Sequence, residues 1–343
     1  MDISRLVPDK FTLALLATVV TASLLPADGR IALALSFVTT GAVALLFFLH
    51  GAKLSREAIV GGITHWRLHL LIFASTFVMF PLIGIALKPL LVHIVTPELY
   101  VGVLYLCVLP ATVQSAIAFT SMAGGNVPGA VCSASASTVL GVFITPLLVN
   151  MIVLPSADAA SSFDAIGRIV LQLVVPFVAG HLLRPWIGKF VHRHKQVLSL
   201  VDRGSILLVV YGAFSAAVIS GLWKQIPALA IVGLLFACAL VLAIALTVTT
   251  LVARWMGFDR ADQITVVFCG SKKSLASGIP MAQLLFAPSA VGAVVLPVML
   301  FHQMQLIVCS VLAQRYARQA AESESEATIE ATVASNGHAP RVG

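Results

Sequence analysis

The chain has 343 residues, of which 59% are apolar and only 10% are charged. Soluble domains contain roughly 45–50% apolar and about 25% charged residues, so this chain has too few charged groups to cover a surface exposed to water. The composition excludes a soluble enzyme, a nucleic-acid-binding protein and a disordered chain. The net charge of +7 is then the cytoplasmic loop bias of a membrane protein, and we expect the lipid bilayer, but no nucleic acid, among its partners.

Apolar segments of the length that crosses a bilayer follow one another along the chain. A spanning helix needs about 20 mostly apolar residues. We expect ten spans, at residues 11–25, 31–50, 68–88, 98–122, 127–154, 168–185, 204–222, 227–253, 263–286 and 289–314. The first follows Arg5 and Lys10 as a signal peptide would, but it lacks a small-residue cleavage site and is expected to be retained. The sequence therefore predicts an all-α polytopic membrane protein, with one ten-helix transporter domain over residues 1–315.

Lysine and arginine residues are divided unequally between the two sides of the predicted bundle. Fifteen of them lie in the two terminal segments and in the loops after spans two, six and eight, whereas the alternate loops hold only Arg30, Lys88, Arg168 and Lys224. Loops rich in these residues stay in the cytoplasm. We therefore expect cytoplasmic N- and C-termini, with a long basic loop from Pro185 to Arg203 on the same side.

The segment after the last span differs in composition from the rest of the chain. Residues 316–343 contain the run AESESEATIEAT, which is polar and acidic and has no usable apolar face. This predicts a disordered cytoplasmic tail. A short helix that docks on a partner is the alternative.

The cysteines give no sign of a metal or cofactor site. All five lie within apolar runs, and none has a spacing suited to a metal: Cys107, Cys132, Cys238, Cys269 and Cys309. We expect them to be small buried side chains, and we expect no cofactor.

The ten spans divide into two groups of five, at about residues 11–154 and 168–314. An odd number of helices in each group places the second group inverted relative to the first, and inverted repeats of this kind are common in secondary transporters. Their substrate sites lie where helices of the two repeats are interrupted by glycine or proline. The sequence thus predicts a pair of interrupted helices at matched positions.

The fourth helix of each group has such an interruption. In the first, Pro110 is followed by Thr112, Gln114 and Ser115; in the second, Gly270, Gly278 and Pro280 surround a polar centre. Proline removes a backbone hydrogen bond, and broken backbone at membrane depth is tolerated only against protein or a wet cavity. Ordinary kinks are the alternative for either motif alone. The matched positions favour two broken helices that cross.

Lys272 and Lys273 lie inside the ninth span. A helix that began after them, at Leu275–Phe286, would be only about 18 Å long and would not cross about 30 Å of hydrocarbon. Ionisable groups at membrane depth are costly and are functional by default. We expect one lysine to face a cavity and the other to face carbonyls or the next helix. The alternative is that both merely bond carbonyls exposed by the break.

Other polar side chains within the spans are further candidates for a substrate or ion pathway. The string CSASAST begins the fifth span and contains Ser133, Ser135 and Thr138, which serve either helix packing or ligand binding. The remaining candidates are Asn126, Ser271, Ser274, Gln283, His302, Gln303 and Gln305. The last three lie in the tenth span, where they either line the pathway or merely bond to neighbours.

Two stretches make the chain resemble a known family. TVQSAIAFTSMAGGNVPGAVCSASAST, which precedes Thr145-Pro146, and FCGSKKSLASGIPMA are similar to the bile acid:sodium symporter family. The SBF-like branch, with bacterial symporters and sodium/bile acid cotransporter member seven, is the nearest in pattern. The resemblance implies a panel domain and a core domain, a crossing of unwound helices 4 and 9, alternating access, and the bacterial inner membrane.

The resemblance also implies where a sodium ion would bind. In the better understood branch, a Ser-Asn pair and hydroxyls of helices 4 and 5 hold sodium together with a glutamate and a glutamine of helix 9. Gln114, Ser115, Ser133 and Ser135 would be the corresponding ligands here. The helix 9 glutamate has no counterpart, and Lys272 and Lys273 occupy its region. A lysine ammonium about 4 Å away would cost a bound sodium roughly 4 kcal/mol at an effective dielectric near 20, so a charged lysine and that sodium exclude each other.

The sequence therefore favours a secondary active transporter, a symporter of a small organic anion, and not an enzyme. The coupling ion is sodium, a proton carried by a buried lysine, or none. A membrane regulator or scaffold that keeps the fold without transport is the alternative. The sequence does not determine the oligomeric state.

The charge bias gives a direct test of topology. A reporter that is active only outside the cytoplasm, fused after Arg315, should stay silent because the C-terminus is predicted to be cytoplasmic. The same reporter fused in the loop near Lys224 should be active. Activity at Arg315 would mean an odd number of spans and would contradict the inverted repeat.

Overall fold

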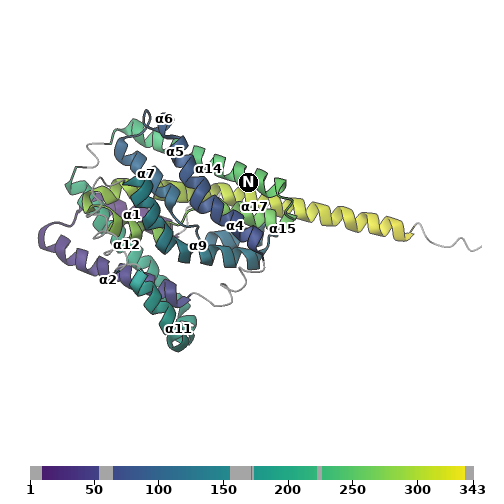
Figure 1. The fold of residues 1–343 in the computed structure, drawn as a ribbon, viewed down its shortest axis with the longest axis horizontal. Coiled ribbons are helices and arrows are strands. Elements are labelled where there is room, and N and C mark those ends of the chain that lie inside the picture. The colour runs from purple at the N-terminus through teal and green to yellow at the C-terminus, as the bar shows by residue number, and fades with distance from the viewer. Residues whose placement is uncertain (1–9, 54–64, 155–170, 172–173, 222–225, 337–343) are drawn as a thin grey trace, which may run out of the picture.

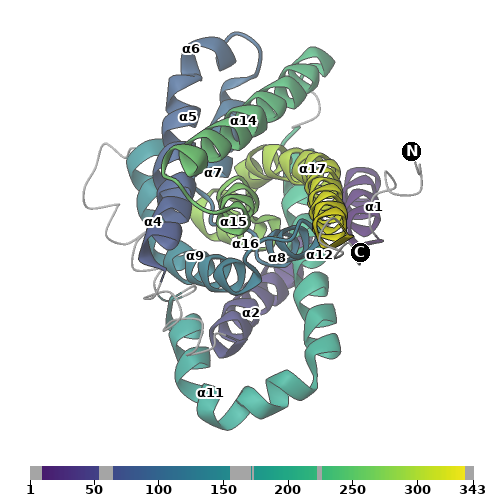
Figure 2. The ribbon, with the colours of Figure 1, turned by 90° about the vertical axis from the view of Figure 1, so that its right-hand side faces the viewer.

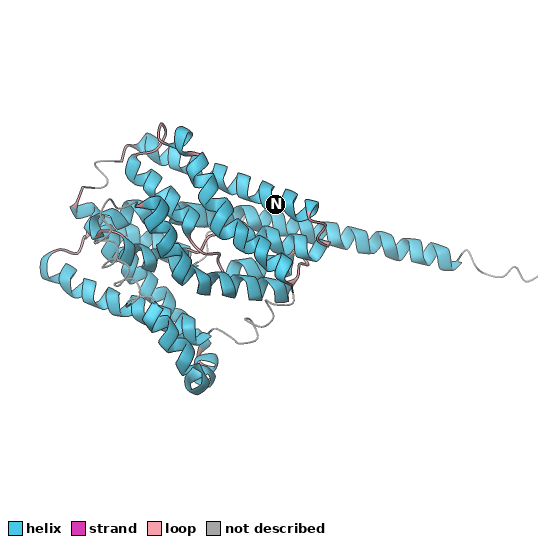
Figure 3. Ribbon diagram, viewed as in Figure 1, coloured by secondary structure: helices cyan, strands magenta, loops and turns pink. Residues whose placement is uncertain are grey.

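The computed structural model describes residues 10–53, 65–154, 171, 174–221 and 226–336. Every regular element within these ranges is a helix (Figures 1 and 3). Six of the helices are long and apolar enough to cross a membrane: Gly29–Ala52, Trp66–Ala86, Val127–Val153, Gln196–Ile219, Ala228–Trp255 and Pro288–Ala320. The prediction of an all-α membrane protein is therefore confirmed.

One group of helices, which we call the outer group, lies along one side of the molecule (Figure 2). It consists of α1 (Lys10–Leu24), α2 (Gly29–Lys53), α11 (Val175–Arg193) and α12 (Lys195–Ile219). Within it α2 packs along α11, and α1 packs along α12. The outer group contacts the rest of the chain mainly through α12.

The remaining helices, which we call the inner group, enclose most of the buried side chains. It begins with α4 (Trp66–Ala74), the π-helical turn η2 (Ser75–Met79), α5 (Phe80–Ala86) and the short α6 (Lys88–Leu91). It continues with α7 (Pro97–Val108), α8 (Gln114–Met122), α9 (Val127–Leu148), the π-helical turn η3 (Val149–Val153), α14 (Ala228–Trp255), α15 (Arg260–Gly270), α16 (Leu275–Leu285) and α17 (Pro288–Asn336). The predicted spans 98–122 and 263–286 are thus two helices each, which confirms both interruptions.

The π-helical turn η2 has a cause in the sequence. The N–H of Phe80 donates to the carbonyl of Ser75, one residue further back than in an α-helix. The next residue is Pro81, which has no N–H. The carbonyl of Thr76 is therefore left without a donor from its own helix, in the middle of the inner group.

The predicted disordered tail is wrong for most of its length. Helix α17 continues to Asn336 and extends beyond the other helices (Figure 1). Residues 316–336 contain no glycine or proline and are rich in alanine and glutamate, which are good helix formers. The packed part of α17 already supplies the costly helix nucleus, so the helix continues without an apolar face. Residues 337–343 lie outside the described residues.

The predicted basic loop at 185–203 is also wrong. Helix α11 continues to Arg193, and α12 begins at Lys195. Lysine and arginine form helices readily, so their concentration in a segment does not mark the end of a helix.

Helices α2 and α11 approach each other closely through two glycines. A Cβ atom on Gly51 would lie 1.9 Å from the Phe177 carbonyl oxygen, and one on Gly180 would lie 1.9 Å from the Phe48 carbonyl oxygen. The contact is reciprocal, because each helix presents a glycine to a carbonyl of the other. Small residues allow this kind of close packing between membrane helices.

Adding a single methyl group should separate the two helices. We expect Gly180→Ala to lower the free energy of unfolding by about 1–3 kcal/mol because its Cβ has no room. The matched control is Gly41→Ala in α2, where nothing lies within 4 Å of the added Cβ. An alanine there should be neutral or stabilise the helix by up to about 1 kcal/mol. Apparent Tm values of the purified variants measure both effects, and equal Tm values would contradict the close contact.

Candidate functional site

The two interruptions meet inside the inner group. Residues 109–113 separate α7 from α8, and residues 271–274 separate α15 from α16. The backbone N–H of Ser274 donates to the Pro110 carbonyl over 2.9 Å. We call these two segments together the crossing.

The break after α7 leaves several backbone groups without helical partners, and the structure satisfies them from other helices. The Val108 carbonyl accepts from Thr145 Oγ1 over 2.9 Å, and the Ala111 N–H donates to Ser137 Oγ over 3.0 Å. Both hydroxyls belong to α9. Buried backbone groups that stay unpaired cost free energy, so these two hydroxyls of α9 stabilise the break.

Lys273 satisfies the other carbonyls. Its Nζ donates to Cys107 O over 2.9 Å, to Leu109 O over 2.7 Å and to Thr76 O over 2.8 Å. It also lies 4.2 Å from the centre of the Phe80 ring. The residue is only 1% exposed. All three of its N–H groups have acceptors, and the side chain ties the end of α7 to the π-helical turn η2.

Gln305 of α17 holds the backbone of Lys273. Its Oε1 accepts from the Lys273 N–H, and its Nε2 donates to the Lys273 carbonyl, both over 2.9 Å. The same Nε2 lies 2.8 Å from Nδ1 of His302. Gln305 is fully buried. It replaces both backbone partners that Lys273 would have in a regular helix.

Lys272 has a different environment. Its Nζ donates to Ser115 O over 3.0 Å and lies 3.8 Å from the centre of the Phe119 ring and 5.6 Å from that of Phe268. The side chain is fully buried. No acidic side chain among the described residues forms an ion pair with it. The ammonium is therefore satisfied by one carbonyl and two aromatic faces only.

The structure brings some of the predicted site residues to the crossing. Lys272, Lys273 and Ser274 are part of it, Thr112 is buried within it, and Ser115 contacts it through its carbonyl. Ser115 Oγ is buried without a hydrogen-bond partner. Ser274 Oγ accepts from the Ser277 N–H and so caps α16. Both lysine side chains are buried, and the expectation that one of them faces a cavity stays a prediction.

Other predicted site residues have local partners or lie elsewhere. Ser271 also belongs to the crossing, where its Oγ donates to Val267 O, and Thr138 Oγ1 donates to Ala134 O within α9. Gln114 is exposed on the first turn of α8, whereas Ser135 and Gln303 are half-buried. Ser133 Oγ lies 2.7 Å from His69 Nδ1, and Gln283 Nε2 donates to Val209 O over 3.5 Å. Asn126 caps α9 and donates to Asp262. The sodium ligand set of Gln114, Ser115, Ser133 and Ser135 stays a prediction.

Three residues that support the crossing were not predicted: Thr76, Ser137 and Thr145. Gln305 was a pathway candidate, and its side chain holds the backbone of Lys273. Ser137 belongs to the string CSASAST, but the sequence does not show which of its hydroxyls faces the break. A usable signal was Pro81, because a proline inside an apolar segment removes an N–H donor and frees a carbonyl in the preceding turn. Thr76 supplies that carbonyl.

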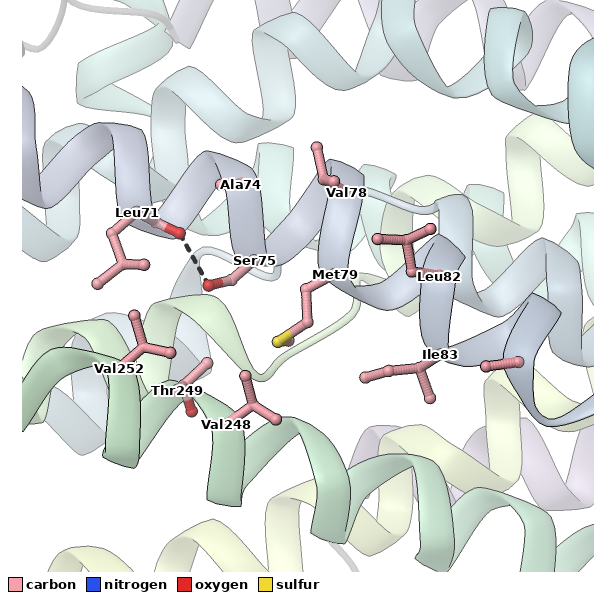
Figure 4. Close-up of a pocket in the computed structure, with 11 residues that line it drawn as sticks. Leu71, Ala74, Ser75, Val78, Met79, Leu82, Ile83, Val248, Thr249 and Val252 are labelled. Atoms are coloured by element: carbon pink, nitrogen blue, oxygen red, sulfur yellow. Dashed lines mark hydrogen bonds between the residues drawn. The ribbon is translucent and has the colours of Figure 1, made fainter. Parts of the chain in front are cut away.

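A separate apolar groove of about 440 Å³ lies between α4–α5 and α14 (Figure 4). Ser75 and Thr249 are its only polar lining residues, and Ser75 Oγ donates to the Leu71 carbonyl over 2.8 Å. It contains no charged side chain, so it does not suit an anion.

The apolar helices define a polytopic membrane protein, and its two interrupted helices meet inside the inner group. Residues 9–318 match the model of the SBF-like CPA transporter family, and the chain belongs to that family. This confirms the resemblance seen in the two sequence stretches around the breaks.

Named relatives cover nearly the whole chain. It is 64% identical to Uncharacterized protein PA2026 of Pseudomonas aeruginosa, over 93% of this chain and 96% of the relative. It is 54% identical to an Escherichia coli protein named Putative symporter YfeH, with the same coverage of 93% and 96%. It is 27% identical to Sodium/bile acid cotransporter 7-B of Xenopus laevis, over 90% of this chain and 92% of the relative.

The role of α9 at the break can be tested with one substitution. Thr145→Val keeps the shape of the side chain and leaves the buried Val108 carbonyl unpaired, which should cost about 1–3 kcal/mol of stability. Thr250→Val in α14 is the control, because its hydroxyl donates only to Leu246 O of its own helix. Thermal unfolding should show a clear loss for the first variant and a small change for the second. Equal losses of stability in the two variants would contradict the role of Thr145 at the break.

Proposed function

We propose that this protein is a secondary active symporter that moves a small organic anion by alternating access, with Lys272 as the positive charge that binds the anion. The environment of Lys272 carries this proposal. A buried ammonium that lacks an anionic partner is costly, and a ligand carboxylate or similar group would supply that partner.

Lys273 does not suit the same role. Its three N–H groups are already used by three carbonyls. Lys272 has one carbonyl acceptor and aromatic faces on its other sides, so it retains N–H groups for a ligand. The two neighbouring lysines are therefore assigned different roles, one in binding and one in structure.

Alternating access accounts for the burial of Lys272. Because the side chain is fully buried, an anion reaches it only after a conformational change. The outer and inner groups are the natural moving parts, and they correspond to the panel and core domains expected from the family resemblance. Helix α2, the second helix of the first predicted repeat, packs along α11, the first helix of the second repeat. Helix α1 packs along α12 in the corresponding way, and this exchange supports the inverted repeat.

The charge of Lys272 also bears on the coupling ion. Sodium within about 4 Å of the ammonium would lose roughly 4 kcal/mol at an effective dielectric near 20, so we place no sodium beside it. A proton carried by Lys272, or sodium bound elsewhere, is compatible with symport. The inner-membrane location with cytoplasmic termini is part of the same proposal.

Ligand binding can be measured without knowing the substrate. Purified protein is heated with monocarboxylates, dicarboxylates and organic sulfates, with and without sodium, at several pH values. At least one anion should raise the Tm of the wild type. In Lys272→Met, the same anion should bind roughly tenfold to a hundredfold more weakly, because hydrogen bonds to a charged group contribute about 1.5–3 kcal/mol.

The control is Lys88→Met, which removes an exposed lysine in α6. It should leave the Tm shift unchanged. Equal shifts in wild type and Lys272→Met would overturn the assigned role of Lys272. If no anion changes the Tm, and none is taken up by proteoliposomes that contain the protein, the result would favour a regulator or scaffold on this fold.

A further inference from the structure

Three backbone carbonyls converge on one point beside the crossing. The oxygens of Cys107 and Leu109 come from the end of α7, and that of Thr76 comes from the π-helical turn η2. All three lie 2.7–2.9 Å from the same nitrogen, Lys273 Nζ. Rings of backbone carbonyls at such a distance are what proteins use to replace the water shell of a monovalent cation.

The convergence depends on the backbone and not on the lysine. Pro110 interrupts α7, so the carbonyls of residues 107 and 109 lie beyond regular helical pairing. Phe80 donates to Ser75 and Pro81 has no N–H, so the Thr76 carbonyl has no helical donor either. Two prolines in different helices thus create an electronegative pocket that needs a positive charge.

The geometry favours the charged form of the lysine. A neutral amine has two N–H groups, whereas three acceptors lie within hydrogen-bond distance of Nζ. The face of the Phe80 ring at 4.2 Å adds a further attraction for a cation. Gln305 holds the backbone from which this side chain enters the pocket.

We propose that the crossing contains a monovalent-cation site that the chain fills with its own ammonium group, that of Lys273. The ligand class is a primary alkylammonium ion, tethered here by the lysine side chain. The site fixes α7 against the α4–α5 segment without any exchangeable ion. This inference goes beyond the transport proposal and does not depend on it, because that proposal concerns Lys272.

The test removes the lysine side chain and supplies an equivalent alkylammonium ion in solution. Lys273→Ala removes the side chain beyond Cβ, and propylammonium has the same three carbons and the same ammonium. Without it the variant should unfold at a much lower temperature than the wild type. Propylammonium chloride should restore much of the lost Tm, with a shift that grows logarithmically with concentration.

Four controls define the result. Propan-1-ol has a similar size and no charge, and tetrapropylammonium has the charge without N–H groups, so neither should restore stability. The wild type should not respond to propylammonium, because its own ammonium fills the site. Lys272→Ala is the matched variant, and it should respond weakly because only one carbonyl contacts Lys272.

A second measurement applies if Lys273→Ala does not survive purification. The tagged variant is extracted into detergent with and without propylammonium and run on a size-exclusion column. A monodisperse peak that requires propylammonium supports the site. Aggregation under both conditions, equal rescue by propan-1-ol, or equal rescue of Lys272→Ala overturns it.

Lys273→Met gives an independent check. Methionine fills the volume of the lysine stem but provides no N–H group, so the three carbonyls stay unpaired. This variant should be destabilised, and propylammonium should not restore it because the space is occupied. A Tm close to that of the wild type would show that the carbonyls need no cation and would overturn the proposal.

Discussion

Backbone hydrogen bonding at membrane depth is the constraint on which the rest of this structure depends. Lipid offers no donor or acceptor, so each N–H or carbonyl freed from a helix needs a partner within the protein. Pro110 and Pro81 free such groups in two separate helices. Thr145 and Ser137 of α9, Gln305 of α17 and Lys273 then converge on the crossing to satisfy them. The arrangement of the inner group follows from this requirement.

The same constraint separates the roles of two neighbouring lysines. Both are buried and both follow the last turn of α15, yet their side chains reach different acceptors. Lys273 meets three carbonyls and is fully satisfied, whereas Lys272 meets one carbonyl and two aromatic rings. An ammonium whose three N–H groups all have acceptors suits a structural role, and one with N–H groups to spare suits binding to a negative ligand. The transport proposal and the cation-site proposal thus depend on different atoms.

Composition was a reliable guide to the membrane and a poor guide to where helices end. The acidic segment after Arg315 and the basic segment after Pro185 were both predicted to be irregular, and α17, α11 and α12 are helical there. Charged residues such as glutamate, lysine and arginine are good helix formers, and a helix that is already nucleated by packing continues through them. Charge reports where the chain meets water, which is a different property.

The sequence by itself determined the class of the protein, the two helix interruptions and the family, because these depend on local properties: apolar length, the missing N–H of proline, and the stretches around the breaks. The expectation that Lys272 and Lys273 lie inside a span also came from length alone, and the structure shows that both side chains are buried. Only the tertiary structure decided which hydroxyl of CSASAST faces the break and that Thr76 and Gln305 support the crossing. It also decided which of the two lysines has acceptors for all three of its N–H groups. Those contacts join residues up to 197 positions apart, and no local pattern records which side chains of distant helices will meet.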